Sequence, residues 1–581
     1  MSFCKVLPLA FIFTMLSCGD KSTPGTDVVA PPTDTGDPPP NVLVDQSDEI
    51  FDNPLLDVEL TVDPQDWETI RNQYRPYYDY FGREACHETP VSHSYDYFDA
   101  SIKIDGEDVG ELAIRKKGFI GSQTNIKPSL KLQFNRSDKS KRYKSMKRLT
   151  LNNVRSDPSH MRTCLAYHLF ETSGVPASRC TFAKVSVNGD HVGVYAVVEE
   201  VKKDYLTRRF ESDDGNLYEA TINDFRAGFQ GYEVETKSNN NFIGLVTEAL
   251  ETGGDVGLED TLSQYINLDE FYRYWATEVM MWQRGGYSGN INNYFMYGDP
   301  SDQNRLRFLP WGPDNVMKDN TFVGAPDSVL ASGLLSSRLY EIPEARQKYY
   351  TMLENVLEST WKEDQLKAWI DERANAIRPA LVTEKAAAFE EDVLFLKNFV
   401  DNRKSVIAAS RVGGEPEWIN GLYPSLCHVP VGQIRARITS TWGTVSESYF
   451  TSGSVEASLT LNGEIISLFS QSGARAGFNT NLQRDRIQFL LDTDDLKRYV
   501  FSINLPLEDR YDPITEPGSY PLFFPAFSAS GSEIRLDTSP ATTTRRFQLR
   551  EGTWAPSMLT KIDGDQIIVD VTVPLFEDPN E

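Results

Sequence analysis

Two short segments near the middle of the chain decide how the rest is interpreted: WQRGGYSGNINNYFMY (residues 282–297) and LRFLPWGPD (residues 306–314). The first predicts a Gly- and Asn-rich loop that enters an aromatic strand. The second predicts another apolar strand, ended by Pro310 and followed by Asp314. Strands that bring amides and a carboxylate to one edge suit a metal–phosphate site, because Mg²⁺ takes oxygen ligands and keeps waters and substrate phosphates. The alternative is a plain hairpin whose Asn and Gly residues serve only turn geometry.

Several upstream segments occur in a characteristic order. They are RKKG (115–118), KPSLKL (127–132), LTLNN (149–153), DPS (157–159) with Arg162, NG (188–189), GVY (193–195), EE (199–200) and GNLY (215–218). Together with the central segments, they resemble the CotH spore-coat kinase family across residues 50–410. The resemblance implies an α+β fold, with an atypical protein-kinase-like domain made of a sheet-rich half and a helical half. It also implies phosphate transfer from ATP to Ser or Thr of secreted or surface proteins.

Two positions depart from the family pattern, which reads roughly D-G-Y in the loop and W-D-x-D after the second strand. Gly285 and Gly312 take the places of two family aspartates, and Asp314 is retained. A kinase needs one carboxylate to accept the substrate proton and others to hold Mg²⁺. The general base is therefore unassigned. The alternative function is a catalytically degenerate pseudokinase that acts as a surface structural or interaction protein.

The resemblance implies roles for five residues. Lys131 would bind phosphate, with Arg115 and Lys117 beside it, while Asn293 and Asp314 would face the Mg²⁺ of Mg-ATP. Lys131 lies on a predicted strand whose Leu130 and Leu132 face the other side. An exposed strand lysine is the alternative.

The pair Glu199-Glu200 closes another predicted strand, just before a basic helix. A glutamate there can pair with the phosphate-binding lysine or cap the helix, and we expect capping.

The N-terminus predicts export. Lys5 precedes an apolar run over residues 6–16, which is too short to span a bilayer, and Ser17-Cys18 follows. Residues 1–18 therefore predict a lipoprotein-type signal peptide with Cys18 as the lipidated residue, and an ordinary cleaved signal is the alternative. The lipid would be the chain's only membrane contact, and the protein would face the periplasm or the cell exterior. Residues 19–47, rich in Pro, Thr and Asp, predict an extended tether.

The remaining boundaries follow from composition. Residues 48–412 predict the kinase-like domain, with helices over 328–340, 344–362, 363–378 and 380–412, and residues 413–428 predict a linker. Residues 429–581 alternate as strands at turn-rich spacing and predict a C-terminal β-sandwich. This module shows no catalytic constellation. A carbohydrate-binding, a protein-binding and a passive spacer role all fit it.

Charge and cysteine usage limit the partners and the compartment. The net charge of −26 over 581 residues disfavours nucleic acid and leaves a surface or secreted protein as the expected partner. Cys4 and Cys18 belong to the signal peptide. The other cysteines, Cys86, Cys164, Cys180 and Cys427, predict two disulfides in an exported protein, with three pairings open. Cys86 lies near His87 and His93, but one cysteine without a second pair is a weak zinc signal.

Overall fold

The computed structural model describes residues 45–577 with internal gaps, all within one compact unit, Asp45–Glu581. The gaps are residues 74, 76–79, 82–84, 91–94, 119–121, 237–241, 320–324, 383–385, 428, 446–452, 471–472, 480–483, 494–496, 505–519, 524–532, 539–544, 549–550 and 559–562. The predictions for the signal peptide, for Cys18 and for the tether up to residue 44 lie outside the described residues.

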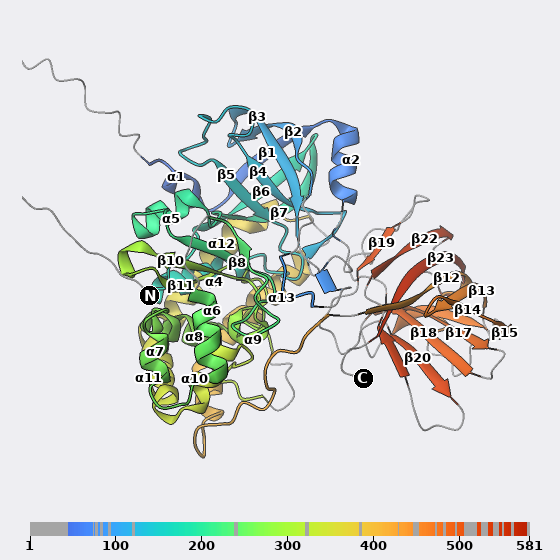
Figure 1. Ribbon diagram of the computed structural model, residues 1–581. Coiled ribbons are helices and arrows are strands. Elements are labelled where there is room, and N and C mark those ends of the chain that lie inside the picture. The colour runs from blue at the N-terminus through green and yellow to red at the C-terminus, as the bar shows by residue number, and fades with distance from the viewer. Residues whose placement is uncertain are drawn as a thin grey trace, which may run out of the picture. The chain divides into compact units, whose positions relative to one another are not determined.

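The first part of the described chain is a closed seven-stranded barrel (Figure 1). Its strands, in chain order, are β1 (Leu56–Val62), β2 (Phe98–Ile104), β3 (Glu107–Lys117), β4 (Ser129–Gln133), β5 (Arg148–Asn152), β6 (Cys180–Val187) and β7 (Asp190–Val198). They pair in the order β1-β2-β3-β4-β5-β7-β6, and β6 closes on β1 in parallel. The inward residues alternate along each strand: Leu130 and Leu132 are buried in the barrel core, and Lys131 between them points outward. Helices α1 (Asp48–Phe51) and α2 (Pro64–Asn72) belong to this part.

A second sheet contains the hairpin predicted from the central segments. It consists of β8 (Asn216–Ala220), β9 (Glu233–Val234), β10 (Tyr294–Asp299) and β11 (Arg305–Pro310), in the order β11-β10-β8-β9. The register pairs Tyr294 with Pro310, so Pro310 is the last residue of its strand. Strand β10 pairs with β11 on one side and with β8 on the other, and the pairing with β8 joins segments far apart in sequence. In Figure 1 this sheet lies between the barrel and a group of helices.

The helices pack around an aromatic core. They are α4 (Arg162–Thr172), α5 (Lys203–Phe210), α6 (Phe242–Thr252), α7 (Leu258–Leu262), α8 (Leu268–Met281), α9 (Tyr287–Asn290), α10 (Leu334–Glu341), α11 (Pro343–Ser359), α12 (Glu363–Ile377) and α13 (Ala386–Ala409). Trp275 of α8 stacks on Tyr349 of α11 with ring centroids 4.0 Å apart. Helix α10 begins later than the helix predicted over 328–340, because the preceding residues run along the α9 loop and Ser332 N–H donates to the Ser288 carbonyl. Within the described residues, none of the helices has both the length and the apolar character needed to cross a bilayer.

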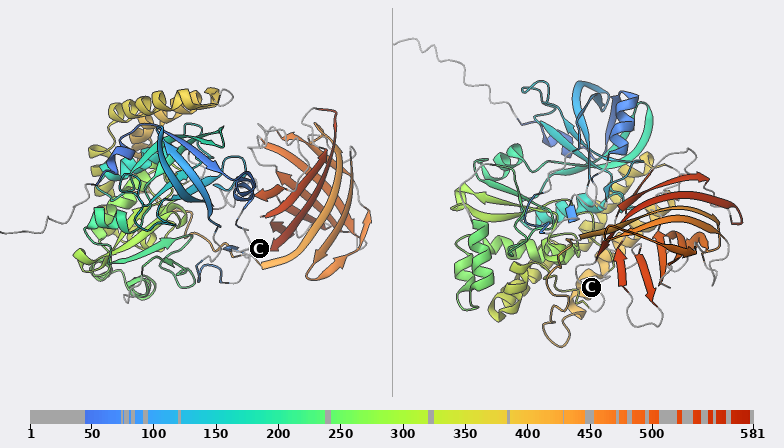
Figure 2. Two further views of the ribbon diagram at one scale, coloured as in Figure 1. Left: turned by 90° about the horizontal axis from the view of Figure 1, so that it is seen from above. Right: turned by 45° about the vertical axis from the view of Figure 1, so that its right-hand side comes forward.

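The C-terminal residues form β-strands with a hydrophobic core of their own. The strands are β12 (Val429–Thr441), β13 (Ser454–Leu461), β14 (Glu464–Ile466), β15 (Leu468–Ser470), β16 (Ala474–Asn479), β17 (Arg484–Thr493), β18 (Lys497–Asn504), β19 (Tyr520–Phe523), β20 (Glu533–Thr538), β21 (Arg545–Gln548), β22 (Glu551–Met558) and β23 (Gln566–Glu577). The predicted sandwich of two sheets is not confirmed, since hydrogen bonds join the strands into one 12-stranded sheet. Strand β23 joins the sheet together, because it pairs with β12, β21 and β22. Figure 2 shows these C-terminal strands, in orange and red, from two further sides.

The four cysteines outside the signal peptide form two disulfides, Cys86–Cys427 and Cys164–Cys180. The first ties a loop before β2 to the end of the 413–428 segment. That segment is also held by other contacts: Arg346 pairs with Glu415 at 2.6 Å, and Tyr423 N–H donates to the Ser332 carbonyl at 2.8 Å. The stretch expected to be a linker therefore lies bound along the helices.

Candidate functional site

A cavity of about 550 Å³ is lined by the barrel and by the second sheet. Its lining includes all five residues singled out for the site: Arg115, Lys117, Lys131, Asn293 and Asp314. Strands β3 and β4 carry the three basic residues, and the ends of the central hairpin carry the other two. The fold thus brings residues from four separate sequence segments to one place.

Lys131 is ion-paired with Glu200 on the cavity wall. Its Nζ lies 2.7 Å from Glu200 Oε1, with 19% of the lysine side chain and 6% of the glutamate side chain exposed. Burial alone would raise the pKa of Glu200, but the Lys131 charge overrides it and lowers that pKa to about 2. Burial likewise opposes the charge on Lys131, and Glu200 more than offsets it, so the pKa of Lys131 is raised. The pair is therefore ionised at neutral pH.

The expectation that the Glu199-Glu200 pair caps the following helix is wrong for Glu200. Helix α5 has Lys202 at its N-cap and no side-chain cap hydrogen bond. Instead, β5 lies between β4 and β7 in the barrel, and the end of β7 delivers Glu200 to Lys131. Arg148 of β5 adds a longer contact, 3.9 Å from its Nε to Glu200 Oε2.

Arg115 and Lys117 of β3 lie on the same face of the sheet as Lys131 of β4. Arg115 is in register with Lys131, and Lys117 with Ser129. The intervening Lys116 points the other way and donates to the Arg71 carbonyl at 2.5 Å. Alternation along the strand thus sends two of three consecutive basic residues into the cavity.

Lys117 is a strongly perturbed basic residue of the cavity wall. Its Nζ donates to Asn152 Oδ1 at 2.6 Å and lies 5.2 Å from the centroid of the Trp311 ring. Burial, aided by the positive charge of Lys131, lowers the pKa of Lys117 to about 7. Its charge therefore changes near neutral pH.

A buried carboxylate holds the loop before β10. Glu278 of α8 accepts hydrogen bonds from the backbone N–H groups of Tyr287 and Ser288, each at 2.9 Å. Burial raises the pKa of Glu278 to about 7. A Cβ at Gly286 would lie 1.9 Å from Glu278 Oε1, so this position requires glycine. The second glycine of the Gly-Gly pair is therefore explained by packing.

Gly285 and Gly312, the two positions where aspartates were expected from the family pattern, lie on either side of Asn293. The Asn293 amide donates from Nδ2 to the Gly285 carbonyl at 2.8 Å. A Cβ at Gly285 would lie 3.3 Å from Asn293 Nδ2, and one at Gly312 would lie 3.3 Å from Asn293 Oδ1. Gly312 also has a φ of +50°, a left-handed conformation in which most side chains are strained. Asn293 thus fits closely against both glycine positions.

Asp314 supplies a carboxylate to the cavity. Burial raises its pKa, and the charges of Lys318 and Lys117 together with its own backbone hydrogen bond oppose that rise. One carboxylate and the Asn293 amide oxygen are donors that Mg²⁺ accepts, and this ion takes the rest of its shell from phosphates and water. The residues present therefore fit Mg²⁺, with fewer protein ligands than the family pattern provides.

Three glutamates in the cavity were not found from the sequence. The carboxylates of Glu219, Glu233 and Glu235 lie within 4.8 Å of one another, and Glu235 is ion-paired with Lys202. Burial raises the pKa of Glu219. Glu219 directly follows the GNLY segment, but no spacing in the sequence indicates that β9 places Glu233, and with it the adjoining Glu235, beside Glu219.

The loop that contains Cys86 also borders the cavity. Cys86 and His87 both line it. The Cys86 and Cys427 sulfurs are joined to each other, and His87 Nε2 accepts a hydrogen bond from Leu426 N–H at 3.1 Å. Cys86 and His87 of the weak zinc signal therefore belong to a disulfide-bonded wall of the cavity, and His93 lies outside the described residues.

A mixed α+β fold, with a lysine–glutamate ion pair on a barrel wall and oxygen donors in the same cavity, defines a kinase-like protein. The family model described as CotH kinase protein matches residues 114–407, about half of the chain. The chain belongs to the CotH family.

Three curated proteins are similar to part of the chain. Inner spore coat protein H of Bacillus subtilis is 24% identical over 263 residues, covering 42% of this chain and 71% of the relative. The H-like protein of the same organism is 25% identical over 275 residues, covering 44% and 78%. Invasin CotH7 of Rhizopus delemar is 21% identical over 266 residues, covering 41% and 43%.

Two solved structures were also matched. The Helicobacter pylori proinflammatory kinase CtkA aligns at a TM-score of 0.25 and 10% identity, covering 48% of this chain and 94% of its own. The HipA–HipB–operator DNA complex of Shewanella oneidensis aligns at a TM-score of 0.22 and 12% identity, covering 45% and 61%.

Proposed function

We propose that the cavity binds Mg-ATP and that the chain is a CotH-type kinase, which transfers phosphate to Ser or Thr hydroxyls of secreted or surface proteins. The ion pair between Lys131 and Glu200 carries this proposal. In protein kinases a strand lysine held by a glutamate orients the nucleotide phosphates, and both partners must be in place for activity. Here a half-buried lysine and a buried glutamate form the wall of a cavity that also contains Asp314.

Each residue has a defined task in this proposal. Lys131 holds a phosphate oxygen, and Arg115 and Lys117 add positive charge on the same wall. Asp314 and the Asn293 amide oxygen hold Mg²⁺, which neutralises phosphate charge when it is bound. The carboxylate that accepts the substrate proton stays unassigned.

A second function is favoured by the surroundings of Asn293. Gly285 and Gly312 offer no carboxylate, and Asn293 fits closely against both positions. Proton acceptance and charge stabilisation each contribute roughly two to four powers of ten in rate. A chain that lacks both carboxylates is expected to bind nucleotide weakly and to transfer phosphate slowly or not at all. It would then act as a pseudokinase scaffold at the surface.

A labelled-ATP transfer assay separates the two functions. The purified chain, its Asp314→Ala variant and a variant with Gly285→Asp and Gly312→Asp would be compared. Transfer by the parent chain that Asp314→Ala removes supports the kinase. Nucleotide binding without transfer supports the pseudokinase, and transfer that survives Asp314→Ala shows that the metal site is elsewhere.

For localisation, we propose an exported lipoprotein anchored through Cys18, with residues 19–47 as a tether. The apolar run before Ser17-Cys18 supports this proposal.

A further inference from the structure

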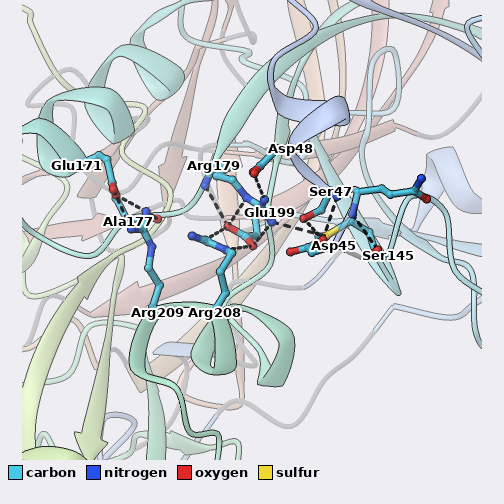
Figure 3. Close-up of polar contacts among 12 residues, drawn as sticks. Asp45, Ser47, Asp48, Ser145, Glu171, Ala177, Arg179, Glu199, Arg208 and Arg209 are labelled. Atoms are coloured by element: carbon cyan, nitrogen blue, oxygen red, sulfur yellow. Dashed lines mark hydrogen bonds and ion pairs between the residues drawn. The ribbon is translucent and has the colours of Figure 1, made fainter. Parts of the chain in front are cut away.

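Glu199, the neighbour of the ion-paired Glu200, has a separate and unusually complete set of partners. It is 1% exposed and lies just beyond the end of β7. Figure 3 shows two arginines converging on its carboxylate. Arg179 donates to it from Nη2 at 2.7 Å, and Arg208 donates from Nε at 3.1 Å and also from Nη2.

The backbone around Glu199 is fixed as well. Its N–H donates to the Arg179 carbonyl at 3.0 Å, and the Arg179 N–H donates to Glu199 Oε2 at 3.2 Å. A carboxylate held from both its side chain and its backbone has little freedom to rotate or shift. Because the backbone of Glu199 is fixed, the backbone of the next residue, Glu200, is fixed as well.

The two arginines join this carboxylate to the rest of the domain. Arg179 directly precedes β6, and its Nη1 also pairs with Asp48 of α1 at 2.6 Å. Arg208 stands on α5, whose Tyr205 and Leu206 are buried. The Glu199 carboxylate therefore links the end of β7 to the start of β6 through Arg179 and to α5 through Arg208.

Consecutive glutamates thus face two ways: Glu199 toward Arg179 and Arg208, and Glu200 toward Lys131 and the cavity. We propose that Glu199 is a positioning residue. Its ion pairs with Arg179 and Arg208 hold Glu200 against Lys131 and thereby fix the position of the phosphate-binding lysine. This inference rests on the proposed function for its consequence on nucleotide binding. Its structural part, the effect on Lys131, does not.

The same helix offers a matched control. Arg209, next to Arg208 on α5, forms an ion pair with Glu171 of α4 (Figure 3). That pair also links α5 to a neighbour, but Glu171 is 46% exposed, and within the described residues it has no hydrogen bond or ion pair with Glu199 or Glu200. Glu171→Gln therefore removes an arginine–glutamate pair from α5 without touching the proposed positioning network.

The test measures the reactivity of Lys131 in the full chain. A short pulse of acetic anhydride followed by peptide mass mapping gives the acetylation rate, which rises when the lysine loses its carboxylate and more of it is uncharged. We expect Glu199→Gln to raise this rate several-fold and to weaken Mg-ATP binding about tenfold, within the range of coupling between contacting residues. Glu171→Gln should change neither quantity.

A double variant distinguishes positioning from general destabilisation. If Glu199 acts through Glu200, then adding Glu199→Gln to Glu200→Gln should not raise the Lys131 rate further. An unchanged rate in folded Glu199→Gln, or a fully additive effect in the double variant, would overturn the proposal. Near-ultraviolet circular dichroism checks folding, and Arg208→Gln, which removes one of the two guanidinium groups, replaces Glu199→Gln if that variant does not fold.

The two ideas can fail separately. If the parent chain binds no Mg-ATP, the proposed function fails, while the acetylation rates still decide whether Glu199 positions the Lys131–Glu200 pair. If Mg-ATP binds and Glu199→Gln changes neither affinity nor acetylation, the positioning role fails and the nucleotide site stands.

Discussion

Replacing Glu200 by glutamine should lower the free energy of unfolding by about the amount that the Lys131–Glu200 ion pair contributes to it. The substitution keeps the shape of the side chain and leaves the Lys131 charge without its carboxylate. Because only 19% of the lysine side chain is exposed, water can compensate only in part. The cost belongs to the class in which one partner of a buried pair is removed, which is commonly about 3–5 kcal/mol.

The pKa of Glu200 gives an independent magnitude. It falls from 4.5 to about 2 on folding, and each pKa unit corresponds to about 1.4 kcal/mol. The pair therefore contributes about 3 kcal/mol to the free energy of unfolding at neutral pH, as an order of magnitude. Because folding depresses this pKa, the contribution is complete above pH 4.5 and is lost as the pH falls through about 2.

Urea unfolding followed by tryptophan fluorescence measures this effect at a series of pH values. The difference between the parent chain and Glu200→Gln should be about 3 kcal/mol at pH 7 and should shrink steadily below pH 4.5. The control Glu171→Gln, at a half-exposed ion pair, should cost less than about 1 kcal/mol. A Glu200→Gln difference that is equally small, or one that does not change in acid, would refute the reasoning.

Four further predictions concern other parts of the chain. Mg-ATP should bind more tightly at pH 6 than at pH 8, because the pKa of Lys117 is about 7 and most of its positive charge is lost above that value. In calorimetry, the affinity of the Lys117→Met variant for Mg-ATP should depend less on pH than that of the parent chain. Non-reducing peptide mapping should recover Cys86 with Cys427 and Cys164 with Cys180, and four alkylatable thiols in fresh protein would contradict this. Removing the Cys86–Cys427 bond should cost more stability than removing the Cys164–Cys180 bond, because the first closes a longer loop, with a sequence separation of 341 against 16. Loop entropy gives roughly 6 against 3 kcal/mol. Urea unfolding of the two Cys→Ser pair variants measures the difference. Changing Cys18→Ala should move the protein from the membrane to the soluble fraction, and unchanged fractionation would exclude lipidation at this residue.

Local features of the site could be predicted from the sequence because they depend on neighbouring residues. The hairpin that carries Asn293 follows from two apolar runs separated by a turn. The outward direction of Lys131 follows from the period of a strand whose adjacent leucines are buried. The helices after Asp314 follow from apolar periodicity, with their ends displaced by a few residues.

Features that depend on contacts between distant parts of the chain could not be predicted in this way. Capping is a local preference, whereas the contact of Glu200 with Lys131 needs β5 to lie between β4 and β7. The glutamate cluster needs β8 to pair with β9. The partner of Cys86 lies 341 residues away, and no pattern near Cys86 indicates it.

Calorimetric titration of Mg-ATP into the full chain is the measurement that tests the nucleotide site most directly. Binding should be weak but measurable, and it should be lost in Lys131→Ala and in Asp314→Ala, because these residues hold the phosphate and the metal. Glu171→Gln, away from the cavity, should bind as the parent does. No heat of binding by the parent chain, or equal binding by Lys131→Ala, would contradict a nucleotide site in this cavity.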